Sequence, residues 1–579
     1  MEGGVFGDAR YLAEFVGHYL FELPTNVFLR IVDCLPSSYI FDYFLQLPKN
    51  NDILVLILEW YFNHTEVTFK LDSQAIKSTD LADVCTVNKI EHMIQLVELP
   101  AFYPKQLTIF SRGLQFTDIK SLMERLEPTI ASYPYLKLVV EDIKKYNNSL
   151  LPDYEFSKDD LRFLLSFPNV KSLSLRCLEA KTPKKRAIVS VSDLLNIEEF
   201  SNYKNLEEFV SINNGLERWG TISFPDTISS LTINSTLIDA SSLTIPESVT
   251  KLNLSKCNIT DEILRDITLP NSLVFLDLSF NELTTLPFAE LPSTLEEVQF
   301  GSNYVIKDIV MPKDGKWLPK LKALILTQCG IHDELLVKLC SHTWPSELIH
   351  LKLTWNLMED ITPLTSLPDS LQILDLASHN PLKINDPTNF KFPEALELLV
   401  INLQPFQGHL KFPPRMKDSR LSSRDNNIDN FEIPSSLYKL YTLSVKVGSL
   451  SKFDWDEFKN LEELSLTNCG IDTIESWTPP PNLKSLSLIA NPIEQITSKA
   501  PLFRKEFHKL KTISFFSCHI VHFDEDIELP ANLTSLDISF NRIQVWNFPQ
   551  ESFKRVRFNL VGNPFTDTVG NGHGLFVRR

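Results

Sequence analysis

Most of the chain repeats one arrangement of apolar and polar positions, LxxLxLxxNxL. Its clearest copy consists of Leu273, Leu276, Leu278, Asn281 and Leu283. Alternating apolar and polar positions are typical of a strand with one buried face, so the LxL segment predicts a short strand with its leucines turned inward. A single copy cannot bury its apolar face alone, and we therefore expect neighbouring copies to stack and share one continuous core.

Fourteen such copies follow one another along the chain. From the central apolar residue of one copy to that of the next, the step is 21 to 27 residues, within the period of roughly 20–29 residues typical of leucine-rich repeats. The sequence thus resembles a leucine-rich-repeat protein. The resemblance implies an α/β repeat fold, a horseshoe-shaped solenoid with parallel strands on its concave face. The central residues are at positions 231, 252, 276, 298, 324, 351, 374, 399, 421, 443, 464, 486, 513 and 536.

Several copies have a proline shortly before the next strand. Proline cannot continue a helix and has no N–H to donate, so the convex segments between strands are predicted to be mostly short, extended or 3₁₀. The longer steps leave room for a helix, which we expect over residues 333–340. The prolines concerned are Pro246, Pro270, Pro292, Pro368, Pro434 and Pro530.

The position after the alternating leucines holds either Asn or Cys. We interpret these residues as a buried structural ladder in which the side chain bonds to neighbouring backbone. A cysteine in such a place behaves as a small apolar residue, and we expect no metal-binding or redox role for it. The ladder residues are Cys257, Asn281, Cys329, Asn356, Cys469, Asn491, Cys518 and Asn541.

The first 65 residues show a helical spacing of apolar residues in place of the LxxLxL arrangement. Val27, Ile31 and Leu35 are four residues apart and would form one apolar stripe of a helix. The segment resembles the opening of an F-box, and the resemblance implies a helix that docks on a Skp-type adaptor. The polar-Lys-x-Trp stretch expected later in that family is absent. The positions that would contact the adaptor are Leu23, Pro24, Val27, Phe28, Ile31 and Leu35.

These N-terminal helices have a second interpretation, because every solenoid must cover its exposed end and an amphipathic helical pair would do so. In either case the sequence predicts four parts. They are a small helical F-box-like domain over residues 1–65, irregular early repeats with helical insertions over 66–165, the repeat array over 166–565 and a loose C-terminal tail over 566–579.

Composition narrows the class of partner. The net charge is −17 and the pI is near 5.3, which disfavours nucleic-acid and acidic-membrane partners because both require a basic face. No apolar run is long enough to span a bilayer, and the N-terminus lacks the basic region and apolar core of a signal peptide. The eight cysteines are dispersed without a CxxC motif, which fits reduced thiols. We therefore expect a cytoplasmic or nuclear protein that is not secreted.

Motifs of enzymes and cofactor sites are missing from the sequence, which has no GxGxxG, GxxxxGK[ST], HExxH or GxSxG. We expect no catalytic activity, cofactor or bound metal. Apolar residues at outward strand positions instead indicate where a partner would bind on the concave face. Alternatively, these side chains tuck against neighbouring strands. The candidates are Phe275, Phe280, Ile325, Ile349 and Trp355.

The array and the N-terminal segment together predict a non-catalytic protein-binding receptor, the substrate-recognition subunit of an SCF-type cullin–RING ubiquitin ligase. The alternative is a scaffold whose N-terminal helices only cap the solenoid, without association with a ligase. The concave side chains do not identify the target protein. Basic residues there are few and mixed with Glu, which disfavours a phosphorylated target.

Overall fold

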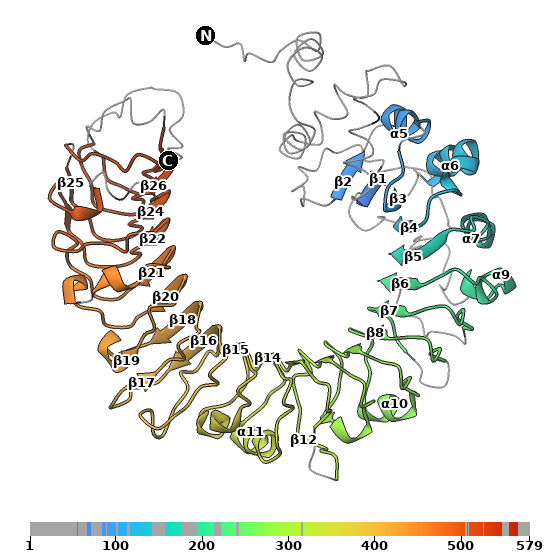
Figure 1. Cartoon of the computed structure of the whole chain (residues 1–579), viewed down its shortest axis with the longest axis horizontal. Helices are drawn as coiled ribbons and strands as arrows, with labels where there is room; N and C mark the ends of the chain where they lie inside the picture. Colours follow the sequence, from blue (N-terminus) through green and yellow to red (C-terminus); the bar gives the residue numbers. More distant parts are fainter. Residues whose placement is uncertain are drawn as a thin grey trace, which may run out of the picture. The chain divides into compact units, whose positions relative to one another are not determined.

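The alternating leucines form short parallel strands in the computed structural model of the chain, one strand to a repeat (Figure 1). Neighbouring strands pair in register, so that Leu351 lies opposite Leu324 on one side and Leu374 on the other. All three side chains are fully buried. The predicted solenoid of parallel strands is therefore confirmed.

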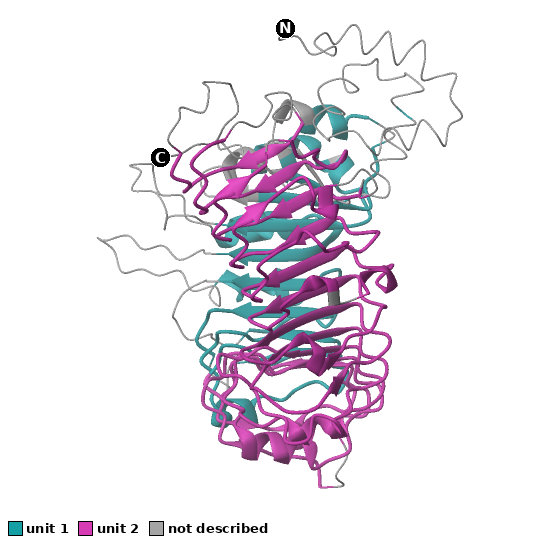
Figure 2. Cartoon of the chain, turned by 90° about the vertical axis from the view of Figure 1, so that its left-hand side faces the viewer, with its two compact units in different colours: residues 1–281 teal, residues 282–579 magenta. Residues whose placement is uncertain are grey.

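The chain forms two units, residues 1–281 and 282–579 (Figure 2). The predicted helical domain over 1–65, apart from residue 55, and the predicted tail over 566–579 lie outside the described residues. The structure describes residue 55 and residues 66–70, 84–87, 90–99, 102–112, 116–141, 157–176, 194–212, 222–238, 243–313, 317–452, 454–503, 507, 509–524, 526–546 and 555–565.

The first unit combines parallel strands with α-helices that lie on one side of them (Figure 1). Its strands pair in the order β2 (Val84–Val87), β1 (Glu66–Lys70), β3 (Gln106–Arg112), β4 (Leu136–Glu141), β5 (Val170–Arg176), β6 (Glu208–Ile212), β7 (Ser230–Asn234), β8 (Lys251–Asn253) and β9 (Phe275–Asp277). The helices are α5 (Ile90–Val97), α6 (Phe116–Ile130), α7 (Lys158–Leu165), α9 (Glu198–Ser201) and α10 (Asp261–Asp266).

The second unit continues the pattern with shorter connections. Its strands are β11 (Glu297–Gln299), β13 (Ala323–Ile325), β14 (His350–Lys352), β15 (Ile373–Leu376), β16 (Leu398–Leu403), β18 (Asp418–Ser423), β20 (Lys439–Leu443), β21 (Glu463–Thr467), β22 (Ser485–Ser487), β24 (Thr512–Ser514), β26 (Ser535–Asp537) and β27 (Arg557–Asn559). As predicted, a helix, α11 (Asp333–Cys340), occupies one longer step.

The other connections in the second unit are short, as the prolines predicted. They include the 3₁₀ helices η5 (Phe288–Glu290), η6 (Thr362–Ser366), η7 (Ile428–Asn430), η8 (Leu450–Lys452), η9 (Trp455–Glu457) and η10 (Pro501–Phe503). Two-residue strands pair in parallel between adjacent connections: β10 (Thr285–Leu286) with β12 (Asp308–Ile309), β17 (Leu410–Lys411) with β19 (Phe431–Glu432), and β23 (Gln495–Ile496) with β25 (His522–Phe523).

A proline carbonyl forms the turn that leads into many of the strands. The N–H of Val249 donates to Pro246 O over 3.1 Å, and that of Leu533 donates to Pro530 O over 3.0 Å. Proline is suited to this place because only its carbonyl is needed there. In the same way, the N–H of the residue three positions later donates to the carbonyl of Pro225, Pro270, Pro292, Pro345, Pro368, Pro393, Pro413 and Pro480.

Hydroxyl groups join successive turns in a way that the sequence pattern did not suggest. The donor is the hydroxyl of the residue just before the first leucine of a repeat. The acceptor is the backbone carbonyl of the residue at the first leucine position in the preceding repeat. For example, Ser272 Oγ donates to Val249 O over 2.8 Å, and Ser370 Oγ donates to Leu348 O over 2.8 Å. Thr227, Ser248 and Ser436 form the equivalent bonds.

Two of the predicted central positions were wrong. The structure places Ser419 opposite Leu399 and Leu440, so the central positions are 419 and 440 rather than 421 and 443. Leu443 is 48% exposed. The leucine spacing misleads here because a polar residue occupies a buried central position, and pairing with both neighbouring strands sets the register instead.

Candidate functional site

The predicted ladder is a series of backbone hydrogen bonds made by asparagine carboxamides. Asn281 Oδ1 accepts the N–H groups of Cys257 and Ile259 in the preceding repeat, over 2.9 and 3.1 Å. Its Nδ2 donates to Leu254 O of that repeat and to Leu278 O of its own, each over 2.9 Å. One side chain therefore satisfies four backbone groups that would otherwise be buried without partners.

Cysteine and asparagine have different parts in this ladder, although both occupy the same position of the repeat. The repeat after each ladder cysteine carries an asparagine at its own ladder position. The Oδ1 atom of this asparagine accepts the N–H of the cysteine over 2.9 Å. We call each such pair a Cys–Asn couplet; the couplets are Cys257–Asn281, Cys329–Asn356, Cys469–Asn491 and Cys518–Asn541.

The ladder thiols face backward along the array. The Sγ atom of Cys257 donates to Ile233 O over 3.2 Å, and that of Cys518 donates to Leu488 O over 2.8 Å. Burial raises the pKa of the Cys257 thiol to about 12 and that of Cys518 to about 11. A thiol with so high a pKa is protonated at neutral pH, so these cysteines lack the thiolate needed for nucleophilic or metal-binding chemistry.

The residue immediately before the ladder position has a positive φ in many repeats. It is Phe280 with φ 58°, Trp355 with φ 60° and Phe540 with φ 56°. These three side chains are 50%, 42% and 56% exposed. Two predicted site residues, Phe280 and Trp355, therefore lie past the ends of β9 and β14. The Lys256 ammonium lies 4.9 Å from the centre of the Phe280 ring.

The remaining candidates lie in or beside strands. Phe275 begins β9 in the first unit. Ile325 ends β13 opposite Lys352, whereas Ile349 directly precedes β14, three residues before Lys352, so the structure does not pair these two residues. All three are partly exposed.

More aliphatic residues share the solvent-facing side of the neighbouring strands. In β15, Leu374 and Leu376 point into the core, so the alternation turns Ile373 outward. Leu398 lies opposite Ile373 on the next strand. The alternation that predicted the strands also turns these residues outward, although the predicted partner site did not include them. The aliphatic patch consists of Ile373, Leu398 and Val400, whereas Ile325 is separated from Val400 by Lys352 and Asp375.

Ion pairs lie beside this patch on the same face, most of them between adjacent strands and one within β18. Lys352 Nζ lies 3.8 Å from Asp375 Oδ2, and Arg420 lies 3.3 Å from Asp418 Oδ2. Three more pairs, Lys322–Glu296, Lys417–Glu397 and Lys439–Glu463, are 2.8 Å apart. Each cation on this part of the face thus has a carboxylate beside it, and the long-range field is small.

The Lys439–Glu463 pair extends to Tyr441, whose hydroxyl donates to Glu463. The Lys439 ammonium and the Tyr441 hydroxyl hold the pKa of Glu463 below its usual range. Burial, together with the bond to Glu463, raises the pKa of Tyr441 to about 12. The Arg420 guanidinium lies 5.3 Å from the centre of the Tyr441 ring. The group remains ionised, apart from the neutral tyrosine, at neutral pH.

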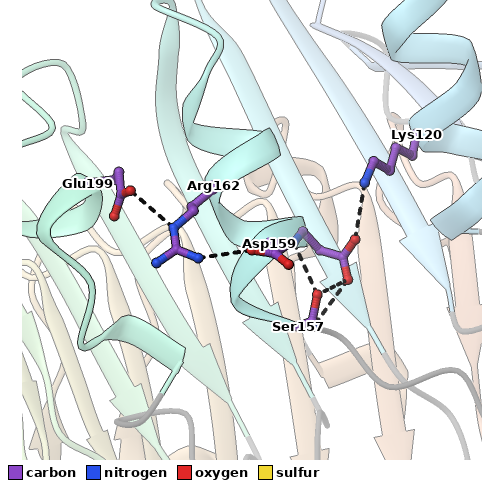
Figure 3. Close-up of polar contacts among 6 residues, drawn as sticks. Lys120, Ser157, Asp159, Arg162 and Glu199 are labelled. Carbon is purple, nitrogen blue, oxygen red and sulfur yellow. Dashed lines mark hydrogen bonds and ion pairs between the residues drawn. The ribbon is translucent and has the colours of Figure 1, made fainter.

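Polar contacts between the helices of the first unit are structural (Figure 3). Ser157 caps α7 and forms a reciprocal capping box with Asp160. Lys120 of α6 lies 3.5 Å from Asp160. Arg162 joins Asp159 and Glu199 over 2.9 and 3.1 Å, which ties α7 to α9 (Figure 3). These contacts are a helix cap, a partly buried ion pair and two exposed ion pairs, and they form no reaction centre.

A second polar group lies on the strand face of the first unit. Lys137 is 3.1 Å from Glu208, to which Ser172 also donates a hydrogen bond. Burial favours the neutral form of Glu208, but the bonds from Ser172 and Lys137 outweigh it and lower the pKa. The carboxylate is thus held ionised between two donors and is poorly suited to act as a general acid at neutral pH.

Within the described part of the chain, no three His, Cys, Asp or Glu side chains gather as a metal site would require. None of the described helices is both long and apolar enough to cross a bilayer. The predicted adaptor-binding residues, Leu23, Pro24, Val27, Phe28, Ile31 and Leu35, lie outside the described residues.

Comparison with known sequences supports the assignment of the repeat. Residues 247–267 and 530–545 match the family model described as Leucine Rich repeat. The first segment contains β8 with Cys257 and the second contains β26 with Asn541. No curated protein matches the chain.

Solved structures show distant similarity. An internalin (inlF) from Listeria monocytogenes str. 4b F2365 is 17% identical, over 71% of this chain and 95% of its own, with a TM-score of 0.35. The plant peptide hormone receptor RGFR1, in complex with RGF2, is 16% identical over 86% and 80%, with a TM-score of 0.38. The mouse RP105/MD-1 complex is 15% identical over 81% and 61%, with a TM-score of 0.32. Likenesses this weak do not transfer a function.

The assignment rests on the chain's own features. Parallel strands recur with inward leucines, and asparagine and cysteine side chains join successive repeats. The two matched segments carry the same arrangement. The chain therefore contains leucine-rich repeats, which stack as parallel strands.

Proposed function

We propose that this chain is a non-catalytic receptor that binds a partner protein on the strand face of its second unit. The observation that carries this proposal is the aliphatic patch, in which Ile373 and Leu398 lie side by side and partly exposed among ion pairs. Fully burying such a side chain contributes about 1.5–3 kcal/mol. An apolar centre inside a polar ring is also the usual arrangement of binding hot spots.

Affinity capture with matched variants tests this proposal. The wild-type chain, Leu398→Lys and Val521→Lys are used to capture proteins from extract, and the bound proteins are quantified by mass spectrometry. Val521, which is 53% exposed outside the patch, provides the matched control. We expect proteins retained by wild type and Val521→Lys to fall by about tenfold or more with Leu398→Lys. Equal retention by all three folded proteins would rule out the aliphatic patch.

We further propose that the receptor is the substrate-recognition subunit of an SCF-type cullin–RING ubiquitin ligase, acting in the cytoplasm or nucleus. The support is the F-box-like spacing of Leu23, Pro24, Val27, Phe28 and Ile31. An adaptor bound there would hold the target near a ubiquitin-charged enzyme and raise its effective concentration. The chain itself would perform no chemical step.

Binding of a purified Skp-type adaptor tests this second proposal. The full-length wild type and Leu398→Lys should bind the adaptor equally, because the aliphatic patch has no part in that contact. Ile31→Asp should lose the interaction, since a carboxylate would replace an apolar side chain at the centre of the helix stripe. Failure of the wild-type chain to bind the adaptor would instead favour a scaffold whose N-terminal helices cap the solenoid.

A further inference from the structure

A histidine lies beside the aliphatic patch on the strand face of the second unit. His350 begins β14, and the register places it opposite Ala323 of β13 on one side and Ile373 of β15 on the other. Leu351, the next residue, is fully buried, so the alternation turns His350 outward together with Ile373. The imidazole therefore borders the aliphatic patch, between two apolar side chains.

The ring of His350 is partly buried, and neither of its nitrogens has a hydrogen-bond partner among the residues that the structure describes. Other histidines do have one: the ring of His342 bonds to Ser341 Oγ over 2.9 Å, and that of His409 bonds to Asp429 O over 3.1 Å. A neutral imidazole offers one donor and one acceptor. A partner that covers the aliphatic patch and this ring must supply polar atoms to it, because covered groups without a bond are costly.

The charged groups that act on His350 belong to three strands. Lys352 follows on the same side of β14, and Asp375 lies opposite Lys352 on β15. Glu297 belongs to β11, which lies beyond β13. Lys352 Nζ is 3.8 Å from Asp375 Oδ2, and Glu297 accepts a hydrogen bond from Gln299 over 2.6 Å. One cation and two carboxylates are therefore near the ring.

The adjoining row of the same face carries three more charges. Lys322 directly precedes β13 and pairs with Glu296, which directly precedes β11, over 2.8 Å. Glu347, three residues before His350, also attracts Lys322. These three residues act mainly on one another, so the charges that bear on the ring are those of β11, β14 and β15.

The surroundings of the ring keep it neutral. Burial lowers the pKa of His350 from its ordinary value of 6.5, and the Lys352 ammonium lowers it further. The carboxylates of Glu297 and Asp375 raise it, but by less. The free ring is therefore uncharged at neutral pH and accepts a proton only in acid. A partner that covers the ring removes more water from it, so the pKa is lower again in the complex.

Coverage of this ring links binding to pH. A group whose pKa is lower in the complex than in the free protein must lose its proton on binding whenever the pH is below the free value. Binding is then strongest above the pKa of the free ring. It weakens as the pH falls through that pKa, by up to about tenfold for each pH unit.

We propose that the neutral imidazole of His350 binds an uncharged polar group of the partner protein beside the aliphatic patch, and that acidification releases the partner. This inference rests on the receptor surface proposed above and adds a polar contact next to Ile373. A backbone amide or a hydroxyl fits, because it can donate to one ring nitrogen or accept from the other. A charged group in this place would lose its hydration under the same cover, which disfavours it.

Affinity measured at several pH values tests the proposal. The protein that wild type and Val521→Lys retain from extract and Leu398→Lys loses is purified. Its affinity for the full-length chain is then measured by biolayer interferometry from about pH 8 to about pH 5.5. The affinity should be constant at the alkaline end and fall by about tenfold or more toward the acid end.

Substitutions of His350 separate this effect from other titrating groups. His350→Gln keeps a neutral donor and acceptor but takes up no proton in this range. It should bind within about threefold of wild type at the alkaline end and lose the pH dependence. His350→Ala should weaken binding there by about threefold to tenfold, because the polar group of the partner loses its bond.

The matched control is His522→Gln, since His522 is exposed in β25, outside the aliphatic patch. This variant should keep both the affinity and the pH dependence of wild type. Thermal melting followed by circular dichroism, at each pH used, checks that every variant remains folded.

The ring of His350 can also be observed without a partner. The full-length chain is prepared with isotope-labelled histidine, and the ring resonance that is missing from His350→Gln is followed with pH by NMR. We expect this ring to titrate below the ordinary histidine value, because burial and Lys352 disfavour its charged form. Addition of the purified partner should lower its pKa further.

The outcomes distinguish this inference from the proposed receptor function. Equal pH dependence in wild type and His350→Gln, unchanged binding by His350→Ala, or a pKa of His350 at or above its ordinary value would overturn the inference and leave the receptor surface intact. Retention of the same proteins by wild type and Leu398→Lys would overturn both, because no partner would then cover the aliphatic patch.

Discussion

A left-handed backbone residue precedes the ladder position in repeat after repeat, with side chains as different as Ser302, Gln328 and Trp355. This conformation costs a non-glycine residue roughly 1–2 kcal/mol. The ladder offsets the cost, because the carboxamide of Asn356 satisfies four backbone groups. Since the ladder imposes the conformation, no residue type marks it. The sequence could therefore predict the ladder, but not that Trp355 leaves the strand direction.

At the scale of one residue, Ser419 tests how much a buried hydroxyl without a hydrogen-bond partner reduces stability. It is 1% exposed at a central position of β18, and its hydroxyl has no hydrogen-bond partner among the described residues. An unsatisfied buried hydroxyl costs about 1–3 kcal/mol. We expect Ser419→Ala to raise the free energy of unfolding by about 1 kcal/mol, measured by urea denaturation.

Ser423, on the same strand, is the matched control for this change. It is also fully buried, but its Oγ donates to Leu403 O over 2.8 Å and accepts from Asn426 Nδ2 over 2.6 Å. We expect Ser423→Ala to lower the free energy of unfolding by about 1–3 kcal/mol. Equal effects of the two substitutions would show that hydrogen bonding does not distinguish these hydroxyls.

At the scale of the repeat element, the backbone conformation after a ladder cysteine differs from that after a ladder asparagine. The residue after each ladder cysteine has a positive φ: Asn258, Gly330, Gly470 and His519. No such residue follows Asn281, Asn356, Asn491 or Asn541. A cysteine repeat therefore turns away from its strand along a different path, and in three of the four repeats glycine or asparagine after the cysteine is the sequence signal for it.

Two glycines at this position separate conformational strain from steric exclusion. Gly330 and Gly470 have φ of +70° and +68°, but a Cβ at Gly330 would lie 2.6 Å from Tyr304 O, and one at Gly470 would meet nothing within 4 Å. We expect Gly470→Ala to cost about 1–2 kcal/mol of unfolding free energy. Gly330→Ala should cost about 1–3 kcal/mol more, because the neighbouring backbone must shift.

Denaturant unfolding of the two glycine variants checks this difference. A Gly470→Asn variant should lose less than Gly470→Ala, since asparagine tolerates the left-handed region and occupies it at position 258. If Gly330→Ala and Gly470→Ala were equally stable, the close approach of Gly330 to Tyr304 would not constrain the repeat.

Across the whole molecule, the sequence predicted the fold best where the same structural requirement recurs in every repeat and selects the same type of residue. Stacked parallel strands require an inward apolar side chain at every second position, and the leucines supply it. The prediction failed at Ser419 and Leu440, where the register depends on pairing with both neighbours. It was incomplete at Ile373, Leu398 and Val400, because outward residues are not constrained by stacking. The adaptor-binding prediction at Leu23 to Leu35 remains a prediction.

The Cys–Asn couplet makes each cysteine repeat of this chain depend on the asparagine repeat that follows it. The amide nitrogens of Cys469 and Ile471 reach their acceptor only on Asn491, in the next repeat. A gene duplication that carried the cysteine repeat without its asparagine successor would bury two donors with nothing to receive them. A change in the length of the array that keeps each cysteine repeat together with its asparagine successor avoids that defect.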